Sequence, residues 1–278
     1  MRKNRKAPLF KPLSLKGLTT LWLMLITPWA LAQAPAQCDT VYAVHDQGIQ
    51  DSQFFTYDLN DNTLESLGQL YQGADFEGLS VHPGTQILYA TEGQPQSRLY
   101  TVDGETGDIA LIGDLNADNA VALAFHPETA DLHCWSDQGL LKLDQHTGAS
   151  TLIWPQSQAE KQFFQTTGPK AIQGLTWNLD GTKLYATADD QPNASTLWEY
   201  DNNGWHIACD DLPKKVEGLE TVSDGRLVYG FHQDTQLGIH FYHANSCQTP
   251  PLKSTPPTMI LKASLGPRKP ARPQIKTL

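Results

Sequence analysis

The amino-acid sequence predicts an all-β protein, a β-propeller of about five four-stranded blades. The first observation is a repeated phrase, an apolar run opened by Gly or Ala, then a polar turn and a second apolar run, at residues 75–90, 120–135, 171–186 and 215–230. The second observation is spacing, because corresponding positions lie 44, 52 and 44 residues apart (Gly78, Ala122, Gly174 and Gly218). A repeat of this length built from short apolar runs is typical of one propeller blade.

Short β-rich segments between Gly, Pro, Asn and Asp turns predict the strands of three complete units. We expect them at 78–82, 86–91, 98–103 and 109–115; at 121–125, 131–135, 140–144 and 150–154; and at 174–178, 183–187, 196–201 and 205–209. No segment has the longer 3.6-residue periodicity of a helix. Four aspartates end the third strand of their units, and we expect them to cap hairpin turns (Asp58, Asp103, Asp144 and Asp201).

Partial units flank the complete ones. Strand-like segments at 40–46, 54–59 and 63–68 correspond to the last three strands of a blade, and segments at 218–222, 226–231 and 238–243 to the first three of another. We expect a strand at 258–265 to close the ring. A two-sheet sandwich is the structural alternative, but it does not explain the repeat.

The N-terminus, residues 1–32, has the pattern of a signal peptide. Six Lys or Arg residues precede an apolar stretch at 18–32. That stretch is interrupted by Pro28 and is shorter than the ~18–20 residues that a membrane span needs. We expect cleavage after Ala32 or Ala36, and therefore an exported protein in the periplasm or the extracellular space. A retained N-terminal anchor is the alternative.

The propeller domain is expected at residues 33–252, followed by a basic, Pro-rich tail at 253–278 that we expect to be flexible. The domain holds 8 Lys and Arg against 30 Asp and Glu, a net charge of −22. Such a body repels nucleic acid and attracts cations or basic partners. We expect no membrane span in the mature chain, and a monomer.

The four cysteines of an exported chain predict disulfides. Two bonds among Cys38, Cys134, Cys209 and Cys247 allow three pairings. Cys38 and Cys247 flank the repeated region, so a bond between them would tie its ends together. This pairing is a hypothesis from position alone.

Candidate site residues come from the geometry of a propeller, in which the innermost strands begin, and the second strands end, around one mouth of the central channel. The innermost strands begin near Glu77, Val121, Gln173 and Glu217. The second strands end near His45, Glu92, Asp137, Asp189 and His232. Oxygen ligands that converge from several blades suit Ca²⁺, and the two histidines add a possible transition metal. We therefore predict a cation at Glu77, Glu217, Glu92, His45 and His232. The alternative is that these side chains make an ordinary solvated channel mouth.

A long loop at 154–171 accounts for the 52-residue spacing and lies at the same mouth. Its Phe163 and Phe164 are candidates for a ligand wall, together with Gln173, Asp137 and Asp189. Packing of both rings back onto the blade is the alternative.

Two of the repeats carry a resemblance to known proteins. The segments DFEGLSVHPGTQILYATE (75–92) and KVEGLETVSDGRLVYGF (215–231) resemble the Glu-Gly-Leu blades of secreted bacterial propellers in the esterase-like phytase group. The resemblance covers roughly 40–245 and implies an exported propeller, possible calcium binding, and action on phosphate esters or lactones. Val121 and Gln173 depart from its Glu-Gly-Leu phrase, and the acidic mouth does not suit a polyanionic substrate.

The function that the sequence favours is a binding module for a small molecule or an envelope protein. The alternative is a metal-dependent hydrolase, acting on a phosphoester or lactone at the same mouth. No G-x-S-x-G, H-E-x-x-H or P-loop motif is present in the sequence.

Overall fold

The computed structural model describes residues 40–46, 50–59, 63–93, 96–155, 172–189, 191–201, 204–233 and 236–248. The predicted signal peptide, the tail with its closing strand at 258–265, and the loop bearing Phe163 and Phe164 lie outside the described residues. Within the described part, no helix is long and apolar enough to cross a membrane.

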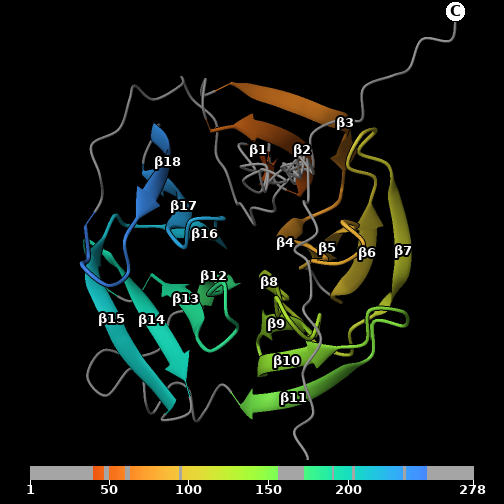
Figure 1. The fold of residues 1–278 in the computed structure, drawn as a ribbon. Helices are drawn as coiled ribbons and strands as arrows, with labels where there is room; N and C mark the ends of the chain where they lie inside the picture. The colour runs from red at the N-terminus through yellow and green to blue at the C-terminus, as the bar shows by residue number, and fades with distance from the viewer. Residues whose placement is uncertain are drawn as a thin grey trace, which may run out of the picture. The chain divides into compact units, whose positions relative to one another are not determined.

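The described strands form five antiparallel sheets that surround a central axis as the blades of a propeller (Figure 1). Blade 1 contains β1 (Thr40–Asp46), β2 (Asp51–Asp58) and β3 (Leu64–Gln72). Blade 2 contains β4 (Phe76–Val81), β5 (Leu88–Glu92), β6 (Arg98–Val102) and β7 (Ile109–Asp114). Blade 3 contains β8 (Ala122–Phe125), β9 (Leu132–Ser136), β10 (Gly139–Leu143) and β11 (Ser150–Pro155).

Blade 4 contains β12 (Ile172–Trp177), β13 (Leu184–Ala188), β14 (Ser195–Asp201) and β15 (Gly204–Leu212). Blade 5 contains β16 (Val216–Thr221), β17 (Leu227–Gln233) and β18 (Gln236–Tyr242). The prediction of an all-β propeller with about five blades is confirmed.

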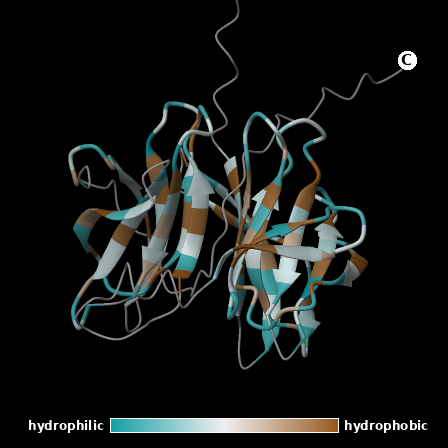
Figure 2. Ribbon diagram, turned by 90° about the horizontal axis from the view of Figure 1, so that it is seen from below, coloured by the Kyte–Doolittle hydropathy of each residue, from teal (hydrophilic) through white to brown (hydrophobic). Residues whose placement is uncertain are grey.

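Burial falls from the axis to the rim. The innermost strand β8 is buried throughout, whereas the outermost β7 and β11 have no buried residue. Figure 2 shows the hydrophobic residues along the strands and hydrophilic ones in many of the connecting turns. The core is therefore built between neighbouring blades, face to face.

Two repeated glycines permit this close packing. A Cβ added at Gly78 would lie 3.1 Å from the backbone nitrogen of Leu123 in the next blade. A Cβ at Gly174 would lie 2.9 Å from Cβ of Leu219, again in the next blade. The Gly of the repeated phrase is therefore needed because adjacent innermost strands approach closely.

Small hydroxyl side chains join blade 2 to blade 3 and blade 4 to blade 5. Thr91 Oγ1 donates to the carbonyl of Ala120 at 2.9 Å, and Thr187 Oγ1 donates to the carbonyl of Val216 at 3.3 Å. These buried side-chain bonds satisfy backbone carbonyls at or just before the start of the next blade's innermost strand.

The hairpin turns follow the predicted chemistry. Asp103 Oδ1 accepts hydrogen bonds from the backbone nitrogens of Glu105 and Thr106, both at 2.8 Å. These bonds lower the pKa of the Asp103 carboxyl. Asp144 makes the corresponding bonds in blade 3.

The structure contains a disulfide between Cys209 and Cys247. It joins β15 of blade 4 to the turn after β18 of blade 5. The Cα atoms of the two cysteines lie 5.6 Å apart. The hypothesis of a Cys38–Cys247 bond is wrong, because Cys247 is already paired. Cys134 is a free, buried thiol, and Cys38 lies outside the described residues.

Candidate functional site

The innermost strands of blades 2, 4 and 5 share a β-bulge at their start. The register shifts between Phe76 and Gly78, between Ile172 and Gly174, and between Val216 and Gly218. The extra residue at each bulge is Glu77, Gln173 or Glu217, three of the residues predicted at the channel mouth. A bulge changes the direction in which its side chain points, so each of these side chains departs from the regular alternation between the two faces of the sheet. We call this end of the axis, where the innermost strands begin, the proximal mouth.

Glu77 and Gln173 line the same small space at the proximal mouth, together with Val121 and the backbone of Gly174. The space is too small to hold a water molecule. Glu217 is half-buried at the corresponding position of β16. The structure therefore brings two of the predicted residues, Glu77 and Gln173, to the lining of one narrow space.

Glu92 is occupied by other groups of its own blade. It is 4% exposed, forms an ion pair with Arg98 at 2.7 Å, and accepts a hydrogen bond from the Tyr100 hydroxyl at 2.8 Å. Burial, reinforced by the bond to Glu92, raises the pKa of Tyr100 to about 12. Arg98 already supplies the positive charge that a cation would bring.

The remaining predicted residues lie in different settings. Asp137 is exposed and accepts a bond from the backbone nitrogen of Asp118 at 3.3 Å. Asp189 is half-buried, and its Oδ1 is buried without a hydrogen-bond partner among the described residues. His45 is buried beside Phe55. The side chain of His232 lies outside the described part, as do Phe163 and Phe164.

The opposite end of the axis, where the innermost strands end, holds a larger cavity of ≈ 130 Å³, which we call the distal mouth. Its lining includes Ser80, Thr176, Thr221 and Glu220, with apolar side chains around them. Burial raises the pKa of the Glu220 carboxyl to about 8. Sequence reasoning missed this cavity. The available signal was a polar residue three positions after the bulge in an otherwise apolar strand.

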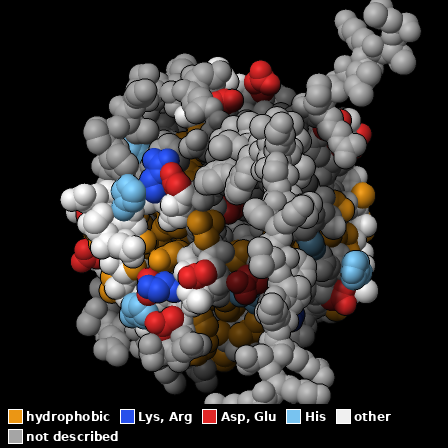
Figure 3. Space-filling view, viewed as in Figure 1, with side chains coloured by type: hydrophobic (Ala, Val, Ile, Leu, Met, Phe, Trp, Pro, Cys, Tyr) orange, Lys and Arg blue, Asp and Glu red, His pale blue; other side chains and the backbone are white. Residues whose placement is uncertain are grey.

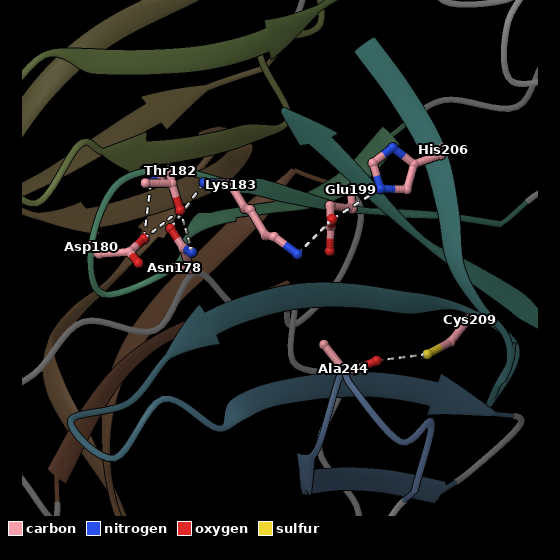
Figure 4. A network of polar contacts seen from close by, with 8 residues as sticks. All are labelled: Asn178, Asp180, Thr182, Lys183, Glu199, His206, Cys209 and Ala244. Atoms are coloured by element: carbon pink, nitrogen blue, oxygen red, sulfur yellow. Dashed lines mark hydrogen bonds and ion pairs between the residues drawn. The ribbon is translucent and has the colours of Figure 1, made fainter. Parts of the chain in front are cut away.

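A third group of polar side chains lies away from the axis, on blade 4. Donor atoms of Glu199, Asp201 and His206 lie within 4.8 Å of one another, so these residues form a possible metal-binding group. Figure 4 shows Glu199 between Lys183 and His206, at 2.8 Å and 2.9 Å. Lys183 therefore neutralises the buried carboxylate without a metal. None of these residues was predicted as a ligand; the signal was the cross-strand pairing of Glu199 with His206.

No protein-family model and no curated protein sequence matches the chain. Among solved structures, a chain in the crystal structure of a nidogen/laminin complex matches with a TM-score of 0.52 and 10% sequence identity, over 82% of this chain and 97% of that chain. The likeness shows the fold alone. TolB from Acinetobacter baumannii matches with a TM-score of 0.45 and 13% identity, over 76% of this chain and 51% of that one.

Proposed function

We propose that this chain is an exported β-propeller that works as a protein-binding module, with the proximal mouth as its binding face. The observation that carries this proposal is the gap between Glu77, Val121 and Gln173, which is too small to hold a water molecule. We infer that a ligand at this end meets a surface and not a pocket. A surface of this kind suits a macromolecular partner better than a small molecule.

Charge indicates the kind of partner. Acidic residues among those described at the innermost-strand starts and the loops beside them include Asp75, Glu77, Asp118, Asp137, Asp189 and Glu217. The cations described at the same end are Lys214, Lys215 and Arg98, and Arg98 is paired with Glu92. An acidic face on an acidic body steers a basic protein toward it.

The fold supports the same proposal without deciding it. The nidogen/laminin structure is a complex between proteins, and it contains a chain of similar fold. We therefore favour a protein partner, and an exported one if the N-terminal segment directs secretion. No feature of the described residues favours the hydrolase alternative.

Calcium at the proximal mouth stays a proposal beside this one. Glu77, Gln173 and Glu217 would supply the side-chain oxygens that this hard cation prefers. Thermal unfolding with EDTA and with added Ca²⁺ tests it, because an ion that binds only the native state raises the midpoint. An unchanged midpoint, in the wild type and in Glu77→Gln alike, contradicts the calcium site but not the protein-binding face.

Affinity capture from an exported-protein fraction tests the binding face. We expect a basic protein to be retained by the wild-type chain at ~50 mM salt and released near ~0.5 M, because salt screens surface charges. The double change Glu77→Lys with Glu217→Lys should abolish retention. The matched control, Glu65→Lys with Glu105→Lys, makes the same charge change at exposed positions away from the proximal mouth and should retain the partner. Equal retention by all three chains would contradict the proposed face.

A further inference from the structure

The distal mouth is a half-open cavity with a polar floor and apolar walls. It lies where the innermost strands β4, β8, β12 and β16 end. The floor carries the hydroxyls of Ser80, Thr176 and Thr221 and the carboxyl of Glu220, and the walls include Phe125, Trp177 and Leu179. Figure 3 shows hydrophobic side chains gathered between acidic ones on the viewed face, near β12 and β16. A few polar groups within apolar walls are the usual layout of a ligand site.

Glu220 is a carboxyl at a position where the other blades need only a hydroxyl. Ser80 Oγ accepts a hydrogen bond from the backbone nitrogen of Phe125 in the next blade at 3.1 Å. Thr176 Oγ1 accepts a hydrogen bond from the backbone nitrogen of Thr221 in the next blade at 3.1 Å. Ala124 occupies the position in blade 3 with no polar atom. A hydroxyl or a methyl is therefore enough at this position in blades 2, 3 and 4.

Only one oxygen of the Glu220 carboxyl is used by the described residues. Oε1 accepts hydrogen bonds from the backbone nitrogen of Thr221 at 3.1 Å and from the Thr176 hydroxyl at 3.4 Å. None of the described residues hydrogen-bonds Oε2. A carboxyl that lines a cavity with one oxygen unused has room for a donor from outside.

The walls offer an ordered apolar surface to the same donor. The Trp177 indole nitrogen donates to Nδ1 of His133 at 3.4 Å, which holds the ring in place. Phe125 packs against His82 with ring centroids 4.9 Å apart. Leu179 is 51% exposed, so its apolar surface is still available for burial.

We propose that the distal mouth binds an alkylammonium group, with the ammonium against the Glu220 carboxylate and the methylene stem against Phe125, Trp177 and Leu179. A primary amine supplies three donors and a positive charge, and aromatic faces attract cations. The acidic body concentrates such cations near the cavity. The group is either a free amine or the lysine side chain of a partner protein, and both share this chemistry. This site is separate from the protein-binding face proposed above.

Binding must be coupled to proton release. Because burial holds the pKa of Glu220 near 8, the carboxyl is largely protonated at pH 7. An ammonium stabilises the carboxylate, and the proton leaves to solvent. Other titratable or charged groups on the surrounding elements are Glu217 on its own strand and Glu77 on β4. The turns after the four innermost strands add His82, then His126 and Glu128, then Asp180 and Lys183, then the Asp224–Arg226 pair.

Calorimetric titration of the processed chain with n-butylammonium tests the proposal, with n-butanol as the neutral analogue. We expect the apparent affinity for the amine to rise by about tenfold per pH unit up to about pH 8 and then to level off, since only the ionised fraction binds. Glu220→Gln should lower the amine affinity at least ~10-fold at pH 8.5. Glu65→Gln, which removes one exposed charge on β3, should leave it unchanged.

Three outcomes would overturn the proposal: equal binding of n-butanol and the amine, an amine affinity independent of pH between 6 and 9, or an unchanged affinity in folded Glu220→Gln. If that variant does not fold, the pH series on the wild type decides. Nα-acetyl-lysine amide in place of n-butylammonium separates the two sources, because only a site open to a lysine side chain admits it. The Glu77→Lys, Glu217→Lys chain should keep its amine affinity, so failure at one mouth is distinguishable from failure at the other.

Discussion

Replacement of Gly174 by Ala tests the reason given for the repeated glycine. The new Cβ would lie 2.7 Å from Thr187 Oγ1, 2.9 Å from Leu219 Cβ and 3.1 Å from the Leu219 backbone nitrogen. The two atoms of Leu219 belong to β16 of the next blade and cannot move unless that strand moves. Overpacking of this kind costs about 1–3 kcal/mol. For a domain of this size the midpoint of thermal unfolding should fall by roughly 3–10 °C.

The assay is thermal and urea unfolding of the processed chain, followed by circular dichroism. Gly84→Ala is the matched control, because Gly84 lies in the turn after β4 and its new Cβ would meet only the His82 side chain, at 3.3 Å. We expect the control to change the free energy of unfolding by less than about 0.5 kcal/mol. If Gly174→Ala is no more destabilising than Gly84→Ala, close approach of the innermost strands is not what requires glycine in the repeat.

Three further predictions concern stability. Removing the disulfide by Cys209→Ser with Cys247→Ser should lower the free energy of unfolding by about 3–4 kcal/mol in denaturant titration, since the bond closes a loop of 38 residues. Burial lowers the pKa of His133 from 6.5 to about 4, so the unfolded chain alone gains a proton below pH 6.5, and His133 stabilises the fold above that pH. Lowering the pH from 7 to 5 should therefore reduce the free energy of unfolding of the wild type by about 2 kcal/mol through His133. The His133→Gln variant should not show this part of the loss. Arg98→Ala should cost about 1–3 kcal/mol in urea unfolding, because it leaves the Glu92 carboxylate buried without its cation, although Arg98 itself is 41% exposed; an unchanged stability would mean that Tyr100 alone suffices.

Most of the fold could be predicted because its signals are local and repeated. The strands β6 (Arg98–Val102) and β7 (Ile109–Asp114) coincide with the predicted segments 98–103 and 109–115 to within a residue. Turn residues such as Asp103 can be predicted from the residue type and from its position at the end of a strand. Each blade repeats the same sequence pattern, so a weakly indicated strand in one unit is supported by clearly indicated strands in the others.

The pairings between distant residues could not be predicted in the same way. Four cysteines allow three sets of two bonds, and the choice of Cys209 for Cys247 depends on how blade 5 packs on blade 4. Glu92 looked available at a strand end, but the register places it opposite Arg98 on the next strand. Reading that register from the hairpin would have predicted the ion pair.

The candidate site was predicted only in part, for a related reason. Sequence position placed Glu77 and Gln173 at the same mouth, and they do line one space. That this space is too small for a water molecule depends on the packing of four strands, which no single segment reports. Glu220 was not predicted as a site residue because it lies within an innermost strand and not at its start. Its relation to Ser80 and Thr176 becomes clear only when the equivalent positions of the blades are compared.

Comparison of equivalent positions separates construction from function in this chain. Positions that join blades recur in some of the blades, as Gly78 with Gly174 and Thr91 with Thr187, although Ala122 takes the Gly position in blade 3. Positions on the axis change from blade to blade: the bulge carries Glu, Gln or Glu, and the residue three places on is Ser, Ala, Thr or Glu. At the position of Glu220, blades 2, 3 and 4 carry a hydroxyl or a methyl. The departures from the repeat at the two mouths are therefore the positions at which we propose binding, and Glu220 is the one acid at its position.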